Sequence, residues 1–175
     1  MTDERREEIV RLAKKLVKRY GTRDPYELAD WLNILVDFAP HPRLLGFSVI
    51  VYDKQVIGLN SRADANTRRC ACAHELAHLI LHHHQDQRFH ASHLLDFSLR
   101  EQRFEAEANV FAATLLLTDA DMKEAIHTFD SVSSAAAFLY VCPELFCAKL
   151  EILNAEGCHY RIPTAPLRSW DGYVQ

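Results

Sequence analysis

The stretch CACAHELAHLILHHH, residues 70–84, decides how this chain folds. It contains the pattern His74-Glu75-Leu76-Ala77-His78. Residues four positions apart on an α-helix lie one turn apart on the same face, so His74 and His78 can bind one metal ion together. Glu75 lies beside them, where its carboxylate can take a proton from a water that the metal activates. The pattern therefore predicts a helix that binds a metal and carries a general base.

The same stretch has the composition of a buried helix. Ala, Leu and Glu are strong helix formers, and neither Gly nor Pro interrupts residues 71–84. Apolar residues recur at helical spacing, and these are Ala73, Leu76, Ala77, Ile80 and Leu81. Because a buried histidine needs a hydrogen-bond partner or a metal, burial strengthens the metal interpretation. The alternative is a buried helix with two hydrogen-bonded histidines.

A second helical stretch, Leu99 to Leu117, supplies the expected third ligand. A catalytic zinc commonly has three protein ligands and one open position, and two His with one Glu is a known set. Glu105 lies at the edge of the buried face of this helix, and Asn109 follows one turn later on the same face. We therefore expect Glu105 to bind the metal and Asn109 to hydrogen-bond the far nitrogen of a ligand histidine. The other charged residues, interpreted as a solvated face, are Arg100, Glu101, Arg103 and Glu107.

Three further side chains compete for a place in the site. His84 has the offset of the third histidine in HExxHxxGxxH sites, but Leu81 stands where that pattern needs Gly. Cys70 lies on the ligand face and could bind zinc as a thiolate, although packing as a small apolar residue is favoured. His82 lies one turn beyond His78, and a supporting role in the site stays open. Residues 82–84 are otherwise interpreted as a polar helix end, stabilised by the helix dipole.

The other elements surround these two helices. Further helices are expected at Asp3–Tyr20, Tyr26–Asn33, Asp119–His127, Val132–Tyr140 and Pro143–Glu156. A strand and a β-hairpin with a turn at Asp53-Lys54 are expected at Ile34–Phe38, Leu45–Tyr52 and Gln55–Asn60. Asp64 or Asn66 caps the metal helix, and a polar loop runs from Gln85 to Ser98. These elements predict an α+β fold, a small sheet packed on a mainly helical body, in a single domain over residues 1–175.

The composition limits the classes of function. The 175 residues carry a formal net charge of −4, and their Lys and Arg are scattered, so direct binding to nucleic acid is disfavoured. The chain has no run of about 18 apolar residues, so no membrane span is expected. Its N-terminus, MTDERREEIV, is charged where a signal peptide needs an apolar core. The five Cys are an odd number within apolar patterns, which suits reduced thiols, so we expect a cytoplasmic protein.

The two site motifs together resemble the ImmA/IrrE family of metallopeptidases. The first is His74-Glu75-x-x-His78 and the second is Glu105-x-x-Ala108-Asn109-x-Phe111-Ala112. A weaker resemblance extends from Asp24 to about Leu117. The resemblance to this family implies a small zincin-like fold. It also implies one Zn²⁺ per chain, bound by the two histidines and Glu105, with Glu75 as the catalytic base.

The resemblance also implies a function. We expect a zinc-dependent endopeptidase that cleaves a helix-turn-helix repressor of a phage, mobile element or stress regulon, encoded nearby. The alternative is a zinc-stabilised binding module that does not cleave, such as an antirepressor or a toxin–antitoxin component. The chain departs from the family at Ala77, usually Gly, and at Thr118-Asp119, usually Met-Pro beside the substrate cleft. A donor to the oxyanion is needed as well, and its candidates are His90, His93, Tyr140, His159 and Tyr160.

Overall fold

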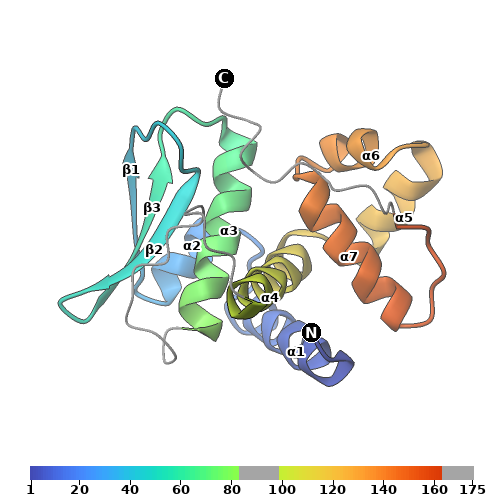
Figure 1. Ribbon diagram of the computed structural model, residues 1–175, viewed down its shortest axis with the longest axis horizontal. Helices are drawn as coiled ribbons and strands as arrows, with labels where there is room; N and C mark the ends of the chain where they lie inside the picture. Colours follow the sequence, from blue (N-terminus) through green and yellow to red (C-terminus); the bar gives the residue numbers. More distant parts are fainter. Residues whose placement is uncertain (83–98, 163–175) are drawn as a thin grey trace.

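The computed structural model of the chain describes residues 1–82 and 99–162 (Figure 1). Along the sequence its elements are α1 (Asp3–Tyr20), α2 (Pro25–Trp31), β1 (Leu35–Ala39), β2 (Gly46–Val51), β3 (Lys54–Asn60), α3 (Ala65–Leu81), α4 (Leu99–Leu116), α5 (Asp119–Thr128), α6 (Val132–Phe138) and α7 (Pro143–Ala155). The predicted α+β class, with a small sheet against a mainly helical body, is confirmed. The expected loop Gln85–Ser98 lies outside the described residues.

Within the described residues, the sheet has three strands in the order β1-β3-β2. β3 pairs in parallel with β1 and antiparallel with β2, so β2 forms one edge of the sheet. The hairpin turns at Tyr52 and Asp53, whose φ angles of 48° and 61° are both left-handed. A two-residue turn of this kind matches the twist of the flanking strands. The predicted turn at Asp53-Lys54 is therefore wrong by one position, because Lys54 already pairs with Val51.

α3, the helix of the HExxH pattern, begins and ends at identifiable residues. The side chain of Asp64 accepts hydrogen bonds from the backbone N–H groups of Asn66 and Thr67, so Asp64 is the N-cap. The helix ends at Leu81, and His82 is its C-cap with a non-helical φ of −123°. The expectation of a helix that continues to residue 84 is wrong at its C-terminal end. Residues 83 and 84 lie outside the part of the chain described.

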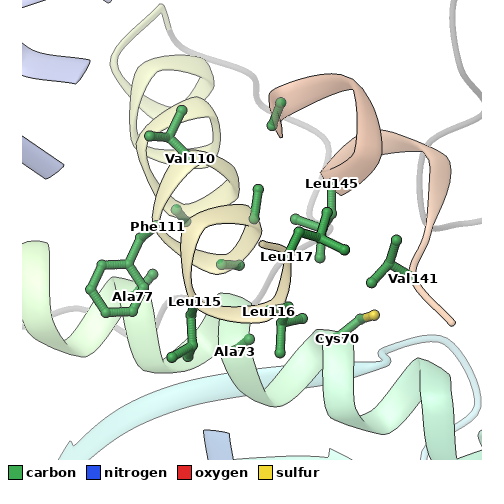
Figure 2. Packing of buried hydrophobic residues seen from close by; sticks show 14 of the residues in the cluster. Cys70, Ala73, Ala77, Val110, Phe111, Leu115, Leu116, Leu117, Val141 and Leu145 are labelled. Carbon is green, nitrogen blue, oxygen red and sulfur yellow. The ribbon is translucent and has the colours of Figure 1, made fainter. Parts of the chain in front are cut away.

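α3 lies between the sheet and α4, and both packing faces are apolar (Figure 1). On the α4 side its small residues Cys70, Ala73 and Ala77 leave room for the larger side chains of α4 (Figure 2). Phe111 and Leu115 of α4 fill that room, and both are fully buried. Small residues facing large ones let two helices approach closely. Cys70 is part of this core, as the favoured interpretation of its burial predicts.

The remaining helices build outward from α4. α1 and α7 both pack on α4, and α6 packs on α7. Lys149 of α7 is buried and pairs with Asp119 at the start of α5, at 2.6 Å between Nζ and Oδ1. Thr118 caps α5 through a reciprocal capping box with Asp121. All five cysteines are free, and no helix in residues 1–82 or 99–162 has the length and apolar character to cross a membrane.

Phe111 tests the packing between α3 and α4. Phe111→Ala should lower the free energy of unfolding by about 3–5 kcal/mol, because a fully buried ring is lost and a cavity remains. Phe138→Ala is the control, since that ring is 41% exposed on α6, and it should cost no more than about 1 kcal/mol. Urea unfolding of both variants measures the difference. Equal losses would mean that Phe111 is not at the core of the helix pair.

Candidate metal centre

Three side chains from α3 and α4 converge on one point. The Nε2 atoms of His74 and His78 lie 3.1 Å apart. Glu105 of α4 reaches both of them, with Oε2 3.1 Å from His74 Nε2 and Oε1 3.2 Å from His78 Nε2. All the potential ligand atoms lie within 4.8 Å of one another. The structure thus brings together the three residues that the sequence nominates as ligands.

This donor set fits a divalent metal ion. Two imidazole nitrogens that face each other at hydrogen-bond distance, with a carboxylate bridging them, are the ligands that zinc takes in a catalytic site. His74 and His78 are buried, whereas the Glu105 side chain is 37% exposed. The cluster therefore has a buried side formed by the histidines and a side that solvent reaches. Three protein ligands leave a fourth position for water or substrate.

Asn109 orients His74. Its side-chain oxygen lies 3.0 Å from His74 Nδ1, on the ring nitrogen that points away from the cluster. An oxygen acceptor at this position places the proton on Nδ1 and leaves the Nε2 lone pair for a metal. Asn109 lies one helical turn after Glu105, so α4 supplies both a candidate ligand and the group that orients the candidate ligand His74.

His82 contacts His78 in a comparable position. The Nδ1 atoms of the two rings lie 3.2 Å apart, so His82 meets the nitrogen of His78 that faces away from the cluster. The ring of His82 is buried and stacks on Phe104 of α4, with 4.3 Å between centroids. His82 lies at the end of α3 as its C-cap, but its ring is buried, and the supporting role that stayed open for it fits this position.

Glu107 is buried, contrary to the prediction from the sequence. The sequence predicts it on a solvated face of α4, but its side chain is 1% exposed. Its carboxylate accepts hydrogen bonds from Arg5 of α1 at 2.8 Å and from Arg103 at 2.8 Å, and lies 3.3 Å from His82 Nε2. Burial raises the pKa of Glu107, but these donors outweigh burial and hold the pKa at about 2. Three donors compensate the carboxylate for the water that it loses.

The sequence contains a signal for the burial of Glu107. Phe104, Glu107 and Phe111 lie three and four positions apart, so the acid belongs to the same buried stripe as the two aromatic residues. Nothing comparable in the local sequence indicates Arg5, which lies 102 positions away from Glu107. The side chain of Glu101, which received the same solvated interpretation, is outside what the structure describes.

Glu75 follows His74 on α3, about 100° around the helix, and contacts the sheet. It is 2% exposed, and Ser48 Oγ of β2 donates a hydrogen bond of 2.9 Å to Glu75 Oε2. Gly46 makes this approach of β2 feasible, because a Cβ there would lie 3.1 Å from Glu75 Cγ. The sequence alone identifies Glu75 as a site residue. The contacts of Ser48 and Gly46 with Glu75 depend on the packing of β2 against α3, which the sequence does not indicate.

The protonation of the cluster follows from the contact between His74 and Glu105. Burial would lower the pKa of His74, but the charge and hydrogen bond of Glu105 outweigh burial and raise it to about 9. Burial would also raise the pKa of Glu105, yet the two imidazoles hold it far below its usual range. A metal-free cluster therefore holds a proton that a metal ion must displace.

Neither the rival ligands nor the oxyanion candidates belong to the cluster of His74, His78 and Glu105 among the residues that the structure describes. Cys70 is not a member of the cluster, and its Sγ lies 3.8 Å from the carbonyl oxygen of Tyr140. His84, His90 and His93 lie outside the described residues. Among the contacts between described residues, none joins the cluster to the other three candidates, which are Tyr140, His159 and Tyr160.

The small sheet, the HExxH helix and the glutamate on a second helix define a zincin-like metal site. Residues 33–151 match the IrrE N-terminal-like domain family (Peptidase_M78), and the chain belongs to this family. A similar protein is the "Uncharacterized immunity region protein 2" of Bacillus phage phi105, which is 38% identical over 109 residues. The match covers 61% of this chain and 66% of the phage protein, slightly less than two thirds of its length.

Removal of Glu105 tests the ligand set. The purified protein should contain about one divalent metal ion per chain, and Glu105→Ala should lose it because two neutral imidazoles remain without an anionic ligand. Glu124→Ala, at an exposed glutamate of α5, should keep the metal. Elemental analysis of the three proteins measures this. Metal retained in a His74→Ala, His78→Ala double variant would contradict the site.

The proton held by His74 predicts a pH dependence. Because its pKa is raised to about 9, the histidine is protonated in the metal-free cluster at lower pH. The apparent metal affinity should therefore rise by about tenfold per pH unit between about pH 6 and pH 8, and level off above about pH 9. Competition with a chelator of known proton affinity measures the slope. An affinity that does not change over this range would show that no proton is displaced.

Proposed function

We propose that the protein is a zinc-dependent endopeptidase that cleaves a helix-turn-helix repressor. The observation that carries the proposal is that Glu75, the residue after the candidate ligand His74, is buried and held by Ser48 of β2. A site that only holds two helices together needs three or four ligands and has no use for a buried carboxylate beside them. Membership of a family named for peptidases supports the same reaction class.

The ligands would be His74, His78 and Glu105. When bound, zinc supplies Lewis-acid chemistry, which polarises a carbonyl group and makes water more acidic. Asn109 keeps the Nε2 atom of His74 available as a ligand by accepting a hydrogen bond from Nδ1. The exposed part of Glu105 indicates the side from which substrate enters.

Glu75 is the proposed general base. It follows His74 directly, so it lies about 100° around the helix and does not share the ligand face. Ser48 donates a hydrogen bond to Oε2, which holds the carboxylate in place. Glu75 would take a proton from the attacking water at Oε1 and return it to the leaving amine.

The edge strand β2 suits an extended peptide substrate. An extended chain can pair with the edge of a sheet through backbone hydrogen bonds. β2 occupies an edge in the order β1-β3-β2, and Ser48 on this strand contacts the proposed base. A peptide bound along β2 would therefore run beside the reacting groups.

Two observations support a protein substrate connected with phage control. The β2–β3 hairpin exposes Ile50, Val51 and Tyr52, and Tyr52 is 96% exposed, which is typical of a surface that meets another protein. The similar phage protein is named for an immunity region, and the ImmA/IrrE resemblance implies repressor substrates. A repressor encoded beside the gene of this protein is the proposed target.

Glu75→Gln separates a peptidase from a binding module. The amide keeps the shape of the side chain but cannot accept the proton, so cleavage should slow by at least about a hundredfold. Zinc content, folding and binding of the repressor should stay unchanged. The measurement incubates each protein with the neighbouring repressor and follows intact repressor on a gel.

The control is Glu151→Gln, at an exposed glutamate of α7, which should cleave like the wild type. Equal cleavage by wild type and Glu75→Gln would reject Glu75 as the base. Tight binding without cleavage by either protein would reject the peptidase and favour the binding module.

A further inference from the structure

A continuous line of polar contacts leads from the metal cluster to the N-terminal helix. His78 Nδ1 lies 3.2 Å from His82 Nδ1, and His82 Nε2 lies 3.3 Å from Glu107 Oε2. Glu107 Oε2 in turn accepts from the Arg5 guanidinium, at 2.8 Å from Nη2 and 3.1 Å from Nε. The line thus crosses from α3 to α4 and from α4 to α1.

The chemistry of these groups gives the line one direction. Glu107, paired with two arginines, is an acceptor, so His82 Nε2 carries a proton and donates it. A neutral His82 then presents the lone pair of Nδ1 to His78. His78 Nδ1 is therefore the donor in that contact, and the lone pair of His78 lies on Nε2, which faces the cluster.

Packing fixes the middle of the line. The His82 ring stacks on Phe104, with 4.3 Å between centroids and an interplanar angle of 25°. Both His82 and Glu107 are 1% exposed, whereas the Arg5 side chain is 28% exposed. The line therefore runs from the interior to the surface, and α1 supplies its outer end.

We propose that His82, Glu107 and Arg5 are positioning residues that hold His78 ready for the metal, so that docking of α1 and metal affinity are linked. α1 lies outside residues 33–151, the segment that matches the family domain. A helix outside the matched segment would thus contribute to the metal site. The inference rests on the proposed metal site but not on peptidase activity.

Linkage is reciprocal, which gives the proposal a measurable consequence. If docked α1 strengthens metal binding, bound metal must stabilise docked α1 by the same factor. Groups that orient a ligand histidine typically change metal affinity by about 10–100-fold when they are removed. A residue that only stabilises the fold lowers stability with and without metal alike and leaves the affinity unchanged.

Arg5→Met and Arg11→Met form the first test. Both residues lie on α1, but Arg11 pairs with Glu7 on the surface of the same helix. Zinc dissociation constants come from competition with a chromophoric chelator, and unfolding is measured with and without zinc. Arg5→Met should weaken zinc binding by about tenfold, and Arg11→Met should leave it unchanged. Arg5→Lys should recover part of the loss, because an ammonium group can also pair with Glu107.

His82→Phe and His82→Gln form the second test. Phe keeps an aromatic ring against Phe104 but offers no acceptor to His78, so zinc binding should weaken by about 10–100-fold. Gln can accept from His78 and donate to Glu107, so it should bind zinc more tightly than the Phe variant. If the Phe variant bound zinc more tightly than the Gln variant, the proposed direction of the hydrogen bonds from His78 to His82 and from His82 to Glu107 would be overturned.

The outcomes separate this inference from the proposed function. Unchanged zinc affinity in Arg5→Met and His82→Phe, with lower stability in both forms, would show a structural network and overturn the inference while the metal site stands. A wild-type protein that binds no zinc would overturn the site and the inference together. A smaller zinc-induced gain in unfolding free energy in both variants supports the linkage.

Discussion

The close approach of α3 and α4 is the constraint on which the rest of the structure depends. Ala73 and Ala77 on α3 accept the large side chains of α4, so the two backbones can come near each other. This approach brings Glu105 within 3.2 Å of both ligand histidines. A metal ion at that point would bridge two helices that are separated in sequence by residues 82–98. The core and the site are therefore built from the same helix pair.

The two sides of α3 have different tasks. The side toward α4 carries His74 and His78, and each ring has its own partner behind it, Asn109 for the first and His82 for the second. The side toward the sheet carries Glu75, which Ser48 of β2 holds. Because Glu75 immediately follows His74, a single turn of helix joins ligand and proposed base, and the sheet and α4 orient them from opposite sides.

The sequence could predict the features that a single helix defines. The spacing of His74 and His78 is a property of the α-helix itself, and Asp64 caps α3 through its own local contacts. Glu105 and Asn109 could be selected because a helix face relates them to each other. The fold class followed from the same periodicities, together with the hairpin pattern between residues 45 and 60.

Contacts between distant segments could not be predicted in the same way. Ser48 and Arg5 reach the site across 27 and 102 positions of sequence, and only the packed structure places them there. The arginines near Glu107 in the sequence suggest a charged surface, but its carboxylate is buried and lies 3.3 Å from His82. The observed hairpin turn lies one residue before the predicted one. Tyr52 takes part in it with a left-handed φ, which a tyrosine rarely adopts and which the sequence therefore does not indicate.

The most direct test of the central claim is anomalous diffraction at the zinc absorption edge from crystals of the zinc-loaded protein. The account predicts one strong peak at about 2.0–2.2 Å from Nε2 of His74, Nε2 of His78 and a carboxylate oxygen of Glu105. A peak at another group, such as the Cys70 thiol, or no peak between the two histidines would contradict it.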